Sequence, residues 1–176
     1  MSEKNEKSIF KKQKTVKPKF EDFAKSLLKN DMLKNALYFN EFLRNNGLTT
    51  EKASKYFWSV GHEGTRICTI SIRENGWWIR CFGRTDGSDE LLDMCEKYLT
   101  DDLKNLILNN IREPQCKKCK SFKSKIILGK MFKRVCWCTP FLFINPNGKS
   151  LEQAKEIVLI NKKTALDIAT ISKYNQ

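Results

Sequence analysis

The feature that most constrains the fold is a stretch of alternating polar and apolar residues in the middle of the chain. The segments 57–62, 65–73 and 77–83 alternate with period two and are rich in β-branched and aromatic residues. This pattern is typical of antiparallel strands that are buried on one face. Asn75-Gly76 separates the last two segments and is a strong signal for a two-residue hairpin turn. The sequence therefore predicts a short, curled antiparallel sheet.

A turn at Asn75-Gly76 would place Ile72 opposite Ile79 and Ile70 opposite Cys81. Cys68 and Cys81 would then be diagonal neighbours, so we expect no disulfide between them. One face of this hairpin is apolar and should meet the helices: Cys68, Ile70, Ile72, Trp77, Ile79 and Cys81. The other face carries Ile67, Thr69, Ser71, Arg73, Trp78, Arg80, Phe82 and Arg84.

Helical periodicity flanks the predicted sheet on both sides. Apolar residues recur at helical spacing over 20–28 and 31–46, and Gly47 is placed to end the second helix. Further helices are expected over 50–56, 88–99 and 100–111, and from Ser150 to about Asn161 with a resumption to Ile171; a strand is expected over 141–144. We expect a basic disordered tail over 1–19 and a single α+β domain over 20–176, with the helices packed on one face of the sheet.

The strand residues also carry a resemblance. The segments Trp58-Ser59-Val60, Arg66-Ile67-Cys68-Thr69-Ile70 and Trp77-Trp78-Ile79-Arg80 resemble those of small bacterial α+β proteins of unknown function. The resemblance covers about half of the chain and implies the fold class and a bacterial cytosol. It implies no activity, and the cysteine segment departs from it.

Four of the seven cysteines form two close pairs. Cys116 and Cys119 are separated by two residues, Cys136 and Cys138 by one, and a basic segment that reads as a hairpin lies between the pairs. Four thiolates delivered in this way can meet at one tetrahedral metal ion. The sequence predicts a zinc-ribbon-like hairpin module over 114–140, inserted before the last strand and helix. Zn²⁺ is the favoured ion and iron the alternative.

Other roles for these cysteines are disfavoured. The N-terminus has no signal-peptide core and no apolar run is long enough to span a bilayer. We therefore expect a cytoplasmic protein without membrane contact, in which structural disulfides are rare. A set of four cysteine ligands leaves no position for water, so the ion should be structural. Cys68, Cys81 and Cys95 are expected to be small core residues.

Positive charge is concentrated in two short segments. The chain has a net charge of +13, of which residues 1–20 contribute +5 and residues 116–135 contribute +8 without a single acidic residue. Some of the second excess can balance the thiolates, and a basic tail is often only solvated. The remainder points to a nucleic acid. The candidate contacts in this segment are Lys117, Lys118, Lys120, Lys123, Lys125, Lys130, Lys133 and Arg134.

The second face of the hairpin is another candidate surface. Arg73 and Arg80 accompany Trp78 on it, and if exposed they would form a stacking platform with cations for phosphates. Alternatively, the cysteine module or the C-terminal helix covers Trp78 and the arginines extend past it to water. The pattern favours the covered arrangement.

Catalytic signals are weak. His62 is the only histidine, and it is expected at a strand end, where the adjacent Glu63 cannot simply orient it. The acidic group at Asp86, Asp89, Glu90 and Asp93 is expected to favour a helix start. We therefore expect a non-enzymatic, zinc-stabilised binding protein that contacts nucleic acid through the basic tail and the basic cysteine hairpin. A ligand-binding or enzymatic domain with a pocket between sheet and helices, or a protein-interaction adaptor, remains an alternative.

Overall fold

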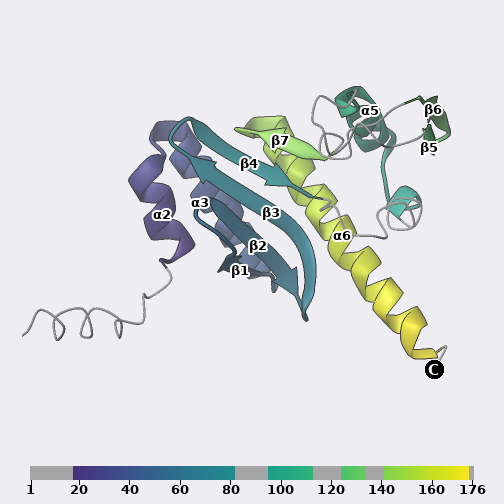
Figure 1. The fold of residues 1–176 in the computed structure, drawn as a ribbon, viewed down its shortest axis with the longest axis horizontal. Coiled ribbons are helices and arrows are strands. Elements are labelled where there is room, and N and C mark those ends of the chain that lie inside the picture. Colours follow the sequence, from purple (N-terminus) through teal and green to yellow (C-terminus); the bar gives the residue numbers. More distant parts are fainter. Residues whose placement is uncertain (1–17, 82–94, 113–123, 134–140, 175–176) are drawn as a thin grey trace, which may run out of the picture.

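A computed structural model describes residues 18–81, 95–112, 124–133 and 141–174 (Figure 1). Two helices come first, α2 (Phe20–Leu27) and α3 (Asn30–Asn45), and four strands follow: β1 (Thr49–Lys52), β2 (Phe57–His62), β3 (Thr65–Arg73) and β4 (Gly76–Arg80). The remaining elements are α5 (Asp101–Asn110), β5 (Lys125–Ile127), β6 (Lys130–Phe132), β7 (Leu142–Ile144) and α6 (Gly148–Tyr174).

The main sheet is antiparallel and has five strands in the order β1-β2-β3-β4-β7, while β5 and β6 form a separate hairpin. Helices α2, α3 and α6 contact the sheet, and α3 lies against both α2 and α6 (Figure 1). The predicted α+β class with helices on one face of an antiparallel sheet is confirmed. None of the described helices combines the length and apolarity needed to cross a bilayer.

The predicted apolar face forms the core of the domain. Cys68, Ile70, Ile72, Trp77, Ile79 and Cys81 are all buried against helix residues such as Phe39, Leu43 and Ile157. Phe39 and Trp77 lie with ring centroids 5.8 Å apart, so α3 is packed directly on β4. We call the opposite side of the sheet the outer face.

The register of β3 and β4 differs from the prediction by two residues. Arg73 pairs with Gly76, and Ile70 pairs with Ile79 rather than Cys81, so the turn is Glu74-Asn75. A shift of two residues keeps every side chain on its predicted face. It does bring Cys68 level with Cys81, and both are free thiols. The predicted diagonal placement was therefore wrong.

Gly76 is required by a contact that lies far away in the sequence. Its φ of +140° is outside the range of ordinary residues, and a Cβ at this position would collide with the Asn145 side chain. Asn145 bridges the backbone of Trp77: its Oδ1 accepts from Trp77 N at 2.8 Å and its own N donates to Trp77 O at 2.8 Å. Glycine is therefore needed here both for its positive φ next to the turn and for this close approach.

Two helix predictions were wrong in position. The segment expected as a helix over 50–56 contains β1, because Thr49–Lys52 pairs with β2. The last helix begins at Gly148 rather than Ser150, and Ser150 Oγ instead bonds the backbone of Asn147. It continues without interruption to Tyr174.

Other boundaries agree with the predictions. The helix α3 ends at Asn45 and Gly47 follows it with φ +68°, while the Thr100 hydroxyl accepts from Leu103 N at the start of α5. The helix expected from Ser88 lies largely outside the described residues. So do most of the tail and both cysteine pairs of the 114–140 module, of which the β5–β6 hairpin is described.

Candidate nucleic-acid interface

A row of four side chains crosses the outer face from β2 to β7. The strand pairing aligns Phe57 with Ser71, Ser71 with Trp78, and Trp78 with Ile144. Directly paired residues point to the same side of a sheet, so these side chains are neighbours. Phe57 is 36% exposed and Ile144 59% exposed. Trp78 is half-buried and Ser71 only 8% exposed, so the row is an apolar strip that is exposed at its two ends and has serine as its one small member.

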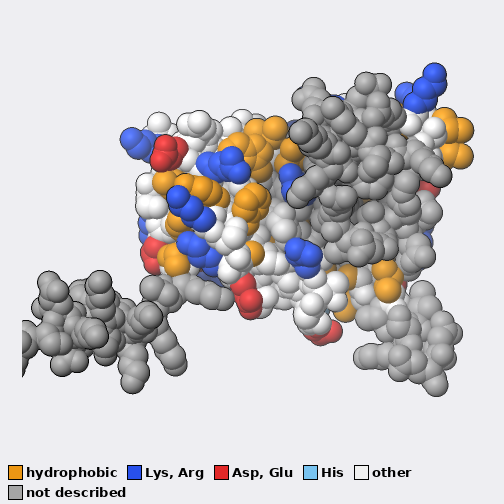
Figure 2. Space-filling model, viewed as in Figure 1, with side chains coloured by type: hydrophobic (Ala, Val, Ile, Leu, Met, Phe, Trp, Pro, Cys, Tyr) orange, Lys and Arg blue, Asp and Glu red, His pale blue; other side chains and the backbone are white. Residues whose placement is uncertain are grey.

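A shallow groove of about 220 Å³ lies over this row. The small Ser71 forms part of its floor between Phe57 and Trp78, and Leu142 and the two arginines complete it. Its lining is Phe57, Thr69, Ser71, Arg73, Trp78, Arg80 and Leu142. Figure 2 shows basic and hydrophobic side chains gathered together over this part of the sheet. We call these seven residues the outer groove.

The arginines of the outer groove are positive charges that lack a carboxylate partner in the described part of the chain. Arg73 is exposed and lies 5.8 Å from the ring centroids of both Tyr56 and Trp78. Arg80 Nε is buried without a hydrogen-bond partner in the described part of the chain. Neither arginine forms an ion pair with a described carboxylate, and none of the described residues that line the groove is acidic. The outer groove therefore suits an anionic ligand with an aromatic or apolar part.

Two other grooves lack this character. One lies over the helices and mixes Lys25, Lys34 and Arg44 with Glu21, Glu41 and Glu152. The other lies beside β1 and includes Glu51 together with Arg66. Carboxylates in both would repel the phosphates of a nucleic acid, so the outer groove is the best match among the three.

Two segments were expected to cover Trp78, the C-terminal helix and the cysteine module, and the structure tests only the first. The C-terminal helix α6 packs on the inner side, where Cys81 Sγ lies 4.0 Å from Ala154 O, so α6 does not cover Trp78. Trp78 and Arg80 are nevertheless half-buried within the outer groove. The cysteine-bearing parts of the proposed metal module lie outside the described residues.

The basic hairpin is only partly described. Lys130 and Lys133 are exposed, and Lys130 lies 5.9 Å from the Phe132 ring centroid. Beside them, the paired residues Ile126 and Met131 are 66% and 65% exposed. Lys125 begins β5. The other predicted contacts lie outside the described residues: Lys117, Lys118, Lys120, Lys123 and Arg134.

The four predicted metal ligands Cys116, Cys119, Cys136 and Cys138 also lie outside the described residues. No cluster of potential metal ligands occurs within 18–81, 95–112, 124–133 or 141–174. The zinc site, with iron as its alternative, stays a prediction.

The remaining cysteines are core residues, as predicted. Cys68, Cys81 and Cys95 are buried free thiols. Burial raises the pKa of Cys68, and burial together with the neighbouring Cys68 raises the pKa of Cys81. Burial raises the pKa of Cys95 to about 11, although its hydrogen bond with the Thr164 side chain opposes the shift. A thiol held neutral in this way is a poor nucleophile.

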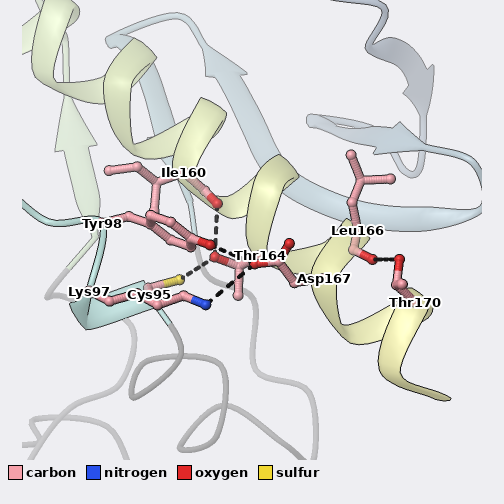
Figure 3. Close-up of polar contacts among 8 residues, drawn as sticks. All are labelled: Cys95, Lys97, Tyr98, Ile160, Thr164, Leu166, Asp167 and Thr170. Carbon is pink, nitrogen blue, oxygen red and sulfur yellow. Dashed lines mark hydrogen bonds and ion pairs between the residues drawn. The ribbon is translucent and has the colours of Figure 1, made fainter. Parts of the chain in front are cut away.

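Cys95 belongs to a polar cluster that attaches the 95–98 segment to α6 (Figure 3). Its Sγ lies 3.3 Å from Thr164 Oγ1, and Tyr98 OH donates to Asp167 Oδ2 at 2.7 Å. The hydrogen bond from Tyr98, followed by the charge of Lys97, lowers the pKa of Asp167 against the effect of desolvation. These contacts give the cluster a structural role, because they attach the 95–98 segment to α6.

We expect these three thiols to be unreactive in the folded protein. At pH 8, with a pKa of about 11, only about one Cys95 in a thousand is a thiolate, and the side chain is fully buried. Labelling with a thiol reagent followed by peptide mass analysis should leave Cys68, Cys81 and Cys95 unmodified until denaturant is added. Rapid modification of Cys68 or Cys81 under native conditions would contradict the packing described above.

His62 has a structural position at the end of β2, as predicted. Its Nδ1 lies 3.0 Å from Gly47 O, which ties the strand to the end of α3. Glu63 was expected to point away, but it has left the strand with φ +47° and its carboxylate lies 3.8 Å from His62 Nε2. Glu63 is largely exposed, so this contact is weak. These observations give no catalytic arrangement.

Several residues of the outer groove were missed in the sequence. Phe57 and Leu142 join it through strand pairing with β3 and β4, and Ile144 extends the apolar row beside it. Alternation along β2 could have predicted the position of Phe57. Its neighbour Trp58 is buried on the inner side, so Phe57 points to the outer face. The pairing of β7 with β4 joins segments more than sixty residues apart and leaves no local pattern.

No protein-family model matches the chain, and searches of curated proteins and of solved structures find no match.

Proposed function

We propose that the chain is a non-enzymatic, zinc-stabilised binding protein that contacts nucleic acid through the outer groove and its basic segments. The observation that carries this proposal is the combination of Arg73, Arg80 and Trp78 in one groove whose described lining residues include no carboxylate. Nucleic-acid binding needs cations for phosphates and apolar faces for bases, and the groove offers both. Among the residues that the structure describes, its lining offers no histidine, cysteine or carboxylate to act as an acid, base or nucleophile.

The basic segments add long-range attraction to this surface. The tail and the 116–135 segment together hold most of the net charge of +13, and clustered cations steer polyanions towards a protein. Zinc would hold the two cysteine pairs together and so fix the lysines between them. In this proposal the outer groove supplies the local contacts and the basic segments supply much of the affinity.

Binding should be strongly dependent on salt. Each phosphate contact lowers log K by about 0.7–0.9 per unit of log salt, so three or more contacts predict a slope steeper than about −2. Fluorescence anisotropy with labelled oligonucleotides between about 50 and about 300 mM KCl would measure it. The Debye length is about 10 Å near the middle of this range and shortens as salt is added, so the screening of exposed charges changes strongly across it. Binding that is absent at low salt, or that does not respond to salt, would contradict the proposal. Those results would favour a small-molecule ligand or a protein partner.

A further inference from the structure

The two arginines of the outer groove lie on opposite sides of Trp78 along the strand direction. Arg73 is level with Gly76 and Arg80 is two residues beyond Trp78 on β4. A strand rises about 3.4 Å per residue, so each arginine backbone is displaced about 7 Å from the level of Trp78. The order along β4 is therefore cation, aromatic ring, cation.

The apolar row runs across the strands, at right angles to the cation–ring–cation order along β4. Phe57, Ser71, Trp78 and Ile144 occupy one level on four neighbouring strands, which are about 4.8 Å apart. Ser71 leaves the space between the larger side chains that forms the groove. At about 220 Å³ this space is smaller than the roughly 300–1,000 Å³ of pockets that enclose drug-sized ligands. Its size suits one flat group that rests on Trp78 with the rest of the ligand outside.

A base can occupy such a groove only if its face is free. In a duplex the bases are stacked and paired, and proteins contact their edges and the phosphates. In a single strand a base can be placed on an aromatic side chain while its phosphates meet cations. The order of Arg73, Trp78 and Arg80 provides one stacking partner with a guanidinium on each side.

We propose that the outer groove is a subsite for one unpaired base of a single-stranded nucleic acid, whose backbone runs along β4. The base lies against Trp78 over Ser71, and the phosphates on its two sides meet Arg73 and Arg80. This inference rests on the proposed nucleic-acid function and adds to it the substrate class and the direction of the bound strand. Contacts to duplex would be left to the basic segments.

The test compares one labelled single-stranded oligonucleotide with its duplex, using the full chain and its Trp78→Ala, Trp78→Phe and Ser71→Leu variants. We expect Trp78→Ala to weaken single-strand binding roughly 5- to 150-fold and to change duplex binding less than about twofold. Trp78→Phe keeps an aromatic face and should retain most of the affinity. Ser71→Leu fills the groove without removing a contact and should weaken single-strand binding as Trp78→Ala does.

The control is Tyr38→Ala, which removes an exposed aromatic residue from α3 in the helix layer and should leave both affinities unchanged. Circular dichroism and thermal melting show whether each variant is folded, and Trp78→Phe and Ser71→Leu keep the test decisive if Trp78→Ala is not. Equal binding of single strand and duplex, with both unaffected by filling the groove, would overturn the subsite and the outer groove as a contact surface, and would leave nucleic-acid binding to the basic segments alone. Failure of the wild type to bind either nucleic acid at low salt would overturn both.

Discussion

Replacing Cys116 with Ser, or Cys138 with Ser, is expected to remove the bound metal and to unfold the segment between the two cysteine pairs. Binding of a structural zinc ion is worth about 10–16 kcal/mol in small zinc modules, so the loss of one of four thiolates affects the whole site. The wild type, purified without added zinc, should contain about one equivalent of metal, and each serine variant far less. Elemental analysis measures the metal content and separates zinc from iron.

A matched control for this prediction is Cys95→Ala. Cys95 is buried and lies 3.3 Å from the Thr164 hydroxyl, so its removal should lower the free energy of unfolding without changing the metal content. A wild-type protein with less than about half an equivalent of metal would contradict the zinc site. Serine variants that keep their full metal content would contradict the assignment of these cysteines as ligands.

Replacing Gly76 with Ala should cost much of the stability of the sheet. The positive φ of Gly76 is strained for alanine by about 1–3 kcal/mol, and the added Cβ collides with Asn145, which adds about 1–3 kcal/mol of overpacking. Both terms act in the same direction, so the free energy of unfolding should fall by roughly 2–6 kcal/mol. Chemical denaturation followed by tryptophan fluorescence measures this change.

Gly64 offers the matched control for Gly76. It also has a positive φ, of +79°, but a Cβ there meets nothing within 4 Å, so Gly64→Ala carries the backbone strain alone. The double variant Gly76→Ala with Asn145→Ala should recover the steric part, giving a coupling energy between the two sites. Equal losses for Gly76→Ala and Gly64→Ala, without coupling to Asn145, would contradict the described contact between Gly76 and Asn145.

The prediction of the sheet shows what local patterns can and cannot indicate. The bounds of β2 and β3 follow from alternation alone, and so does the assignment of Ile70, Ile72 and Ile79 to the buried face. Asn75-Gly76 was interpreted as the turn because that pair favours positive φ. Glycine is indeed needed for its positive φ, but it is also needed for the contact with Asn145, which no window around residue 76 includes.

The errors in the helices have the same origin. Thr50 can cap a helix in isolation, but Thr49 and Thr50 are also β-branched, and pairing with Val60 and Gly61 makes this segment a strand. The last helix passes Asn161 without a break, because that side chain donates to the carbonyl oxygens of Ile67 and Cys81. Both outcomes depend on tertiary contacts.

The candidate site likewise has a part that local sequence patterns predict and a part that depends on tertiary contacts. Arg73, Trp78 and Arg80 could be placed on one face from their spacing, whereas the groove itself depends on Phe57 and Leu142 from other strands. Four-cysteine spacing indicates a metal site by chemistry alone. It does not place that site relative to the sheet.

The most direct test of the central claim is the salt dependence of nucleic-acid binding by the Arg73→Gln/Arg80→Gln double variant. If both guanidinium groups meet phosphates of a single strand, the slope of log K against log salt should become shallower by about 1.4, which is about 0.7 for each contact. The charge-matched control is Lys34→Gln/Arg44→Gln on the exposed surface of α3, which should leave the slope unchanged. An unchanged slope in the double arginine variant, or an equal change in the control, would show that nucleic acid does not bind in the outer groove.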